Sequence, residues 1–163
     1  MISRPTTEQV LLDCCRVLED DVLPGVADET MQVRLVMLGK VLRNAAVRAA
    51  HEVAWMREET ARIEEYAGGV AASTGSEPLR TALDDLAAGP HDSLHLADVV
   101  EVYGRASEAL SVALEAALAA ERDDLVREGE SLLSARLGHE NDVVGGWNSA
   151  GRVSGPGAAS GPG

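Results

Sequence analysis

The sequence predicts an all-α protein: a helical bundle with two long helices, a shorter N-terminal helix and a short connecting helix. Two observations support this fold class. First, aromatic residues make up 2% of the 163 residues and Phe is missing, so Ala and aliphatic side chains must form the core, which suits closely packed helices. Second, apolar residues recur every three or four positions along most of the chain, and no stretch alternates long enough to propose a sheet.

The first helix is expected over residues 6–22. Thr6 stands three residues before Gln9, the spacing of a capping box in which each side chain bonds the other's backbone N–H. Apolar residues then repeat at helical spacing as far as Val22, and Pro24-Gly25 ends the helix.

The second helix is expected to begin near Asp28 or Thr30 and to run to Gly68-Gly69. Its apolar stripe advances in steps of three and four, which is a near-heptad pattern: Leu35, Leu38, Leu42, Ala45, Ala49, Val53, Met56, Thr60, Ile63 and Ala67. Such a helix would span about 39 residues, or roughly 58 Å. A helix of that length needs packing partners along it.

The remainder divides into a loop, a short helix, a long helix and a tail. Residues 68–77 form the Gly/Ser/Ala loop, and Gly89-Pro90 closes the short helix that follows it. Ser93 can cap the second long helix, in which residues 121–124 are a candidate break. After residue 137 the composition turns to Gly and Pro, so we expect a helical domain over 1–137 and a disordered tail over 138–163.

The net charge of −13 argues against nucleic acid or an anionic membrane as a partner, because both would repel the chain. The N-terminus lacks a signal-peptide apolar stretch and no run of about 18 apolar residues occurs, which predicts a cytoplasmic protein. Cys14 and Cys15 are adjacent, a spacing that fits neither a disulfide framework nor a metal motif.

Motifs for catalysis or cofactor binding do not emerge from the sequence. The only Lys, Lys40, lies inside a predicted helix rather than in a phosphate-binding loop. The Glu-x-x-His pairs of a di-iron bundle do not occur, and His91 and His95, four residues apart, have no evident further ligand. We therefore assign no catalytic, cofactor or metal residue. A site assembled in space from distant residues is the one enzymatic alternative that spacing leaves open.

Six residues are candidates for binding a partner protein: Arg34, Leu35, Leu42, Arg43, Trp55 and Trp147. The arginines either pair with acids of the same or a neighbouring helix, or contact a phosphate or carboxylate. Trp55 is expected in the core or at an interface, and Trp147 is a lone aromatic residue in the expected tail and a candidate docking anchor. Residues 77–137 hold 13 acidic and 5 basic residues, which form either a solvated face or a surface for a basic partner.

The N-terminal part resembles a family of small bacterial proteins of obscure function. The resemblance covers residues 4 to about 67 and rests on Arg4-Pro5-Thr6, on the segment from Val17 to Pro24, and on Val33-Arg34-Leu35 opening a long helix with Arg43 further on. Members are encoded beside an aminoglycoside-phosphotransferase-like kinase and an acyl-CoA dehydrogenase, and in the levulinate pathway one works with the kinase that phosphorylates a hydroxyacyl-CoA.

The resemblance implies a non-catalytic accessory subunit of such a kinase in acyl-CoA catabolism. The kinase is the expected partner, the dehydrogenase is a second candidate, and a homo-oligomer is left open. The alternative function is a self-associating helical scaffold or regulator unrelated to acyl-CoA metabolism.

Overall fold

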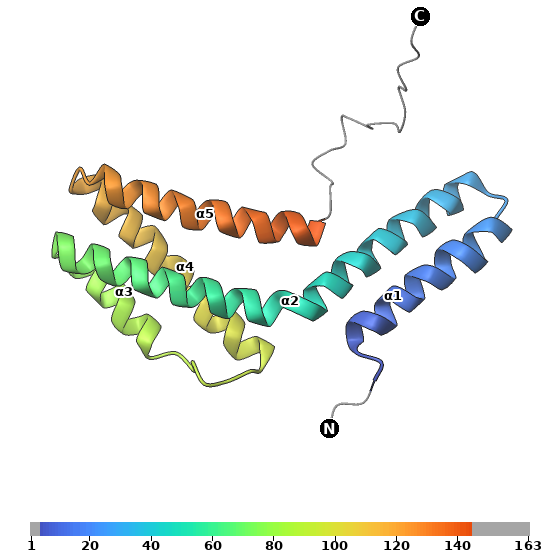
Figure 1. The fold of residues 1–163 in the computed structure, drawn as a ribbon, viewed down its shortest axis with the longest axis horizontal. Coiled ribbons are helices and arrows are strands. Elements are labelled where there is room, and N and C mark those ends of the chain that lie inside the picture. Colours follow the sequence, from blue (N-terminus) through green and yellow to red (C-terminus); the bar gives the residue numbers. More distant parts are fainter. Residues whose placement is uncertain (1–3, 145–163) are drawn as a thin grey trace, which may run out of the picture.

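The computed structural model describes residues 4–144, which fold into five α-helices and short helical turns (Figure 1). The helices are α1 (Thr7–Val17), α2 (Glu29–Thr74), α3 (Glu77–Ala87), α4 (Leu96–Ala119) and α5 (Asp123–Val144). The predicted fold class, an all-α helical bundle, is confirmed. None of the described helices is long and apolar enough to cross a membrane.

The molecule has two parts that share α2. The N-terminal half of α2 and α1 form an antiparallel hairpin, and the C-terminal half of α2 packs with α3, α4 and α5 into a four-helix bundle (Figure 1). Among the described elements, α1 packs on α2 and not on α3, α4 or α5. The hairpin therefore projects from the bundle, and α1 covers only one side of the N-terminal half of α2.

The helix starts follow the sequence signals. At the start of α1, Thr6 and Gln9 form the predicted capping box, and Asp28 caps α2 by accepting a hydrogen bond of 2.8 Å from the Met31 N–H. After α1 the chain makes one π-helical turn, Leu18–Val22, and a short 3-10 turn, Leu23–Gly25, that contains the predicted stop.

The predicted loop from residue 68 is wrong, because α2 continues through Gly68-Gly69 to Thr74. Val70 is fully buried and Ala71 nearly so, and burial of these side chains outweighs the helix-weakening effect of two glycines, about 1 kcal/mol each. The helix ends instead at Gly75, whose left-handed φ of 69° suits glycine.

The predicted second long helix is two helices. The chain turns back after Ala119, and α5 begins at Asp123, so the break expected at 121–124 is confirmed. Ser93 does not cap α4. The cap position is His95, while the Ser93 hydroxyl accepts a hydrogen bond from the His95 N–H and donates one of 2.6 Å to Asp98.

The helical domain extends further than expected at its C-terminal end. Helix α5 passes through Gly138 and ends at Val144, and Val143 is buried at 8% exposure. The predicted boundary at 137 is therefore too early, because an apolar contact beyond the first glycine keeps the helix packed. The remainder of the predicted tail, including Trp147, lies outside the described residues.

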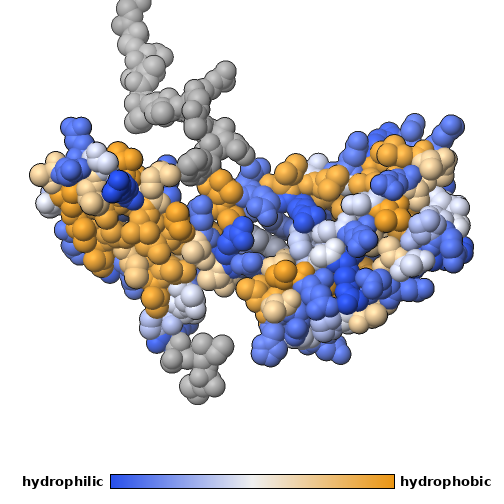
Figure 2. All heavy atoms as spheres, turned by 180° about the vertical axis from the view of Figure 1, so that it is seen from behind, coloured by the Kyte–Doolittle hydropathy of each residue, from blue (hydrophilic) through white to orange (hydrophobic). Residues whose placement is uncertain are grey.

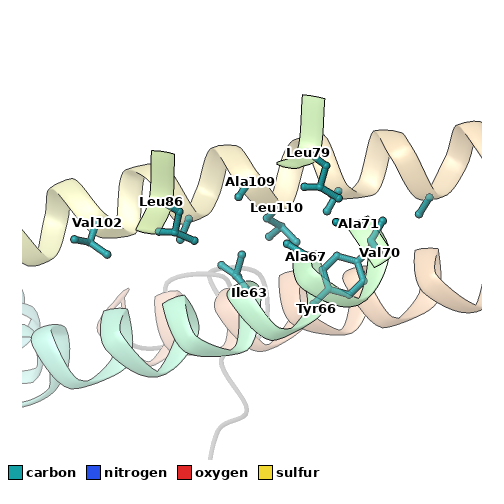
Figure 3. Packing of buried hydrophobic residues seen from close by; sticks show 13 residues of the cluster. Ile63, Tyr66, Ala67, Val70, Ala71, Leu79, Leu86, Val102, Ala109 and Leu110 are labelled. Carbon is teal, nitrogen blue, oxygen red and sulfur yellow. The ribbon is translucent and has the colours of Figure 1, made fainter. Parts of the chain in front are cut away.

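The core lies in the bundle and consists mainly of alanine and aliphatic side chains (Figure 3). Leu79 and Leu86 of α3 are fully buried against α4, which contributes a row of alanines. Small residues let the helices approach closely. At Gly129 of α5 an added Cβ would lie 2.7 Å from the Tyr66 hydroxyl and still nearer the Leu114 side chain.

Candidate functional site

The hairpin is held by a narrow line of contact between α1 and α2. The buried Cys15 thiol donates to the Gly39 carbonyl oxygen over 3.4 Å, and burial raises the pKa of that thiol. Beside it the Arg43 guanidinium of α2 donates to the Glu19 carboxylate in the π-helical turn after α1, with one contact at 2.6 Å. Glycine at position 39 permits this approach, because a Cβ there would lie 3.2 Å from a Glu19 carboxylate oxygen.

Helical periodicity places an apolar surface to one side of this contact line, which we call the hairpin face. Successive residues of a helix are rotated by about 100° around its axis. On α2, positions 31, 35, 38, 42 and 45 therefore lie to one side of Gly39. On α1 and the residue after it, positions 7, 11, 14 and 18 lie to the corresponding side of Cys15. The face consists of exposed Cys14, Met31 and Leu38 with half-buried Leu11, Leu18, Leu35 and Leu42. Exposed Val10, Val17 and Val41 lie at its outer margin, about 140–160° around their helices from the contact line.

Exposed apolar side chains are concentrated on the hairpin as a whole. Of sixteen large apolar side chains exposed in the described part of the chain, ten lie between Val10 and Val41. In Figure 2 the orange of hydrophobic residues is concentrated over the hairpin, at the left of the view. The other side of the hairpin carries the pair of Glu19 with Arg43 and the exposed Lys40, together with exposed Leu12 and Val36.

The predicted partner-binding residues divide between these two sides. Leu35 and Leu42 lie on the hairpin face, and exposed Arg34 lies at its outer edge. Arg43 forms an ion pair with Glu19. Of the two roles expected for the arginines, the structure therefore shows the pairing with an acidic residue of a neighbouring segment.

Trp55 lies elsewhere, in a half-buried aromatic and carboxylate cluster between α2, α4 and α5. Its ring stacks between the imidazoles of His51 and His139, with centroid distances of 4.8 and 4.7 Å. Glu59, one turn after Trp55, is 8% exposed and accepts hydrogen bonds from Tyr103 over 2.5 Å and from His139 Nδ1 over 2.6 Å. Every oxygen of this buried carboxylate therefore has a partner.

The cluster borders a cavity of about 170 Å³ that Arg48 and Arg136 also line. The Arg136 guanidinium lies over the Tyr103 ring, 4.7 Å from its centroid. Burial and the bond to Glu59 raise the pKa of Tyr103 above its usual value, so the phenol stays protonated and donates to the carboxylate. The contact between His139 and Glu59 ties the end of α5 to the middle of α2.

Sequence reasoning missed Glu59, Tyr103 and His139. Their mutual contacts span 44 and 80 residues, and no local pattern reports such distances. A local signal did exist, because His51, Trp55 and Glu59 follow one another at intervals of four and so share one face of a helix.

His91 and His95, the two histidines considered for metal binding, have different structural roles. The His91 ring nitrogen Nε2 lies 2.7 Å from the Leu86 carbonyl oxygen, and His95 occupies the cap position of α4. Within residues 4–144 the structure contains no group of three or more His, Cys, Asp or Glu side chains arranged to hold a metal ion.

The fold and these surfaces define an all-α protein in which an apolar helical hairpin projects from an acidic bundle. No protein-family model, curated protein or solved structure matches the chain.

Proposed function

We propose that the chain is a non-catalytic accessory subunit that binds an aminoglycoside-phosphotransferase-like kinase in acyl-CoA catabolism, in the cytoplasm. The resemblance of residues 4–67 supports the identity of the partner, and an acyl-CoA dehydrogenase is the second candidate. The observation that carries the proposal is the charge of the bundle. Residues 48–144 hold 20 acidic and 8 basic residues, so a basic protein surface is attracted to it.

Most of this negative charge is available for a partner. Within residues 77–137, arginines form ion pairs with four acids, Glu77, Asp85, Glu101 and Asp124, of the thirteen present. Glu108 and Glu115 lie exposed on α4. Charges of this kind steer association and change its rate more than they change the strength of the final complex.

Co-expression with the neighbouring kinase gene tests the proposal. A tag on this chain should retain the kinase through washing in low salt, and raising the ionic strength should weaken retention steeply. Recovery of the tagged chain without the kinase at low salt would contradict the proposal.

A second candidate function is a self-associating scaffold or regulator unrelated to acyl-CoA metabolism, which the exposed apolar hairpin favours. The two functions differ in the kinase experiment, since a scaffold of this kind assembles in the same way whether or not the kinase is present.

A further inference from the structure

We infer that the hairpin face is a dimer interface, on which a second copy of this chain places its own hairpin face to complete a four-helix bundle. The inference holds independently of the proposed kinase partner, because it concerns the opposite end of the molecule from the acidic bundle.

The apolar seam of α2 has the spacing of a helix inside a bundle. Residues 31, 35, 38, 42, 45 and 49 follow one another in steps of four and three, the a and d positions of a coiled coil. In a completed bundle such residues point to the central axis and are buried. In this hairpin Leu35 and Leu42 are half-buried, and Leu38 is 46% exposed. The seam therefore has the exposure of one half of a bundle.

The same pattern occurs on α1. There it is shorter: Leu11, Cys14 and, in the turn after α1, Leu18 are three and four residues apart, and they lie on the same side of the hairpin as the α2 seam. Two parallel seams on one face of an antiparallel pair match the inner surface of half a four-helix bundle, in which each pair covers the other. A two-fold axis brings identical faces together, so one self-complementary surface suffices.

The composition of α2 gives a second argument. Of the twelve residues from Met31 to Leu42, eight are large and apolar, and they surround the helix on every side. Helices of this kind are buried in folded proteins. Within the described chain this segment is covered only along the line of Gly39 by α1 and the turns that follow α1.

Area and charge favour a second copy as the occupant. The ten side chains of the face and its margin offer roughly 500 Å² of apolar surface per chain, or about 1,000 Å² for two copies when all of it is covered, which is the lower limit for a specific interface. Residues 4–47 hold seven acidic and five basic residues, against 20 and 8 in residues 48–144. Two copies that meet through their hairpins thus keep their strongly acidic bundles apart and bring nearly neutral surfaces together.

Sedimentation of the full chain at micromolar concentration tests the inference. We expect a dimer for the wild type. Leu38→Glu places a charge on the face and should weaken dimerisation by about a hundredfold or more. Val33→Glu is the matched control: Val33 is 63% exposed on the same helix but away from the face, so its dimer should persist. Both side chains are exposed in the monomer, so circular dichroism should show the same helix content in all three proteins.

Cys14 provides a second readout that does not depend on mass. It is exposed on the hairpin face, whereas Cys15 is buried in the α1–α2 contact. Alkylation of Cys14 by a maleimide should be slow in the wild-type dimer and in Val33→Glu, and fast in Leu38→Glu. Should Leu38→Glu reduce the helix content, Met31→Glu replaces it, since Met31 is 44% exposed on the same side of α2 as Leu38.

Three results would overturn the inference. A wild-type chain that is monomeric with fast Cys14 alkylation leaves the face uncovered, and loss of kinase retention in Leu38→Glu would then assign the face to the kinase. A monomer with slow alkylation assigns it to the chain's own residues 145–163. If Val33→Glu disrupts the dimer as much as Leu38→Glu does, the dimer interface is not the hairpin face. If the wild-type chain forms the dimer but does not retain the kinase, only the proposed function is contradicted.

Discussion

Helix α5 packs on the bundle so closely at Gly129 that alanine does not fit, and this makes Gly129→Ala a sharp test of the fold. An added Cβ would lie 2.7 Å from the Tyr66 hydroxyl, which itself donates to the Leu125 carbonyl over 2.9 Å. The Leu114 side chain is nearer still. Insertion of a methyl group into a packed core costs about 1–3 kcal/mol.

Gly104→Ala is the matched control. Gly104 also lies inside a helix, α4, but is exposed and has no atom within 4 Å of the added Cβ, so the substitution should show only the gain in helix propensity of roughly 1 kcal/mol. We expect Gly104→Ala to stabilise the protein. Gly129→Ala receives the same gain and should still be about 1–3 kcal/mol less stable than Gly104→Ala.

Thermal unfolding followed by circular dichroism measures this difference. For a chain of this size each kcal/mol shifts Tm by about 2–4 °C, so the two variants should be clearly resolved. If Gly129→Ala were as stable as Gly104→Ala, the close packing of α5 on Tyr66 and Leu114 would be refuted.

Three further predictions concern the cluster around Glu59 and the acidic surface. Tyr103→Phe leaves the buried Glu59 carboxylate without one donor and should lower the free energy of unfolding by about 1.5–3 kcal/mol in urea titrations, whereas an unchanged value would mean that the hydrogen bond does not form. Because the folded pKa of Tyr103 is raised above that of the unfolded chain, its stabilisation is present below about pH 10 and is lost as the pH rises further; Tyr103→Phe should flatten this alkaline loss. Glu108→Gln with Glu115→Gln should slow association with the proposed kinase partner and reduce its salt dependence, and an unaltered salt dependence would contradict a contact through this acidic surface.

Local patterns predicted the helices well and their contacts poorly. The capping box at Thr6, the start of α2 near Asp28 and the break at residues 121–124 are features of a few consecutive residues, and the structure confirms them. The cap predicted at Ser93 is equally local and is wrong, because His95 takes the cap position. The stop predicted at Gly68-Gly69 failed, since burial of Val70 in the tertiary core decides whether a weak helix former stays helical.

The candidate surfaces show the same division. The heptad stripe identified Leu35 and Leu42, but only the position of α1 shows which part of the stripe lacks cover. The cluster of Glu59 with Tyr103 and His139 joins three helices, and no local sequence pattern predicts contacts between residues so far apart in the chain.

Reconstitution of this chain with its proposed partner, an aminoglycoside-phosphotransferase-like kinase, tests the proposed function most directly. The kinase alone and the chain alone should show little phosphate transfer to a hydroxyacyl-CoA, and titration of the kinase with the chain should raise its activity to a plateau at a fixed molar ratio. A kinase that is fully active alone, unchanged by the chain and recovered without it in low salt would contradict the accessory-subunit account.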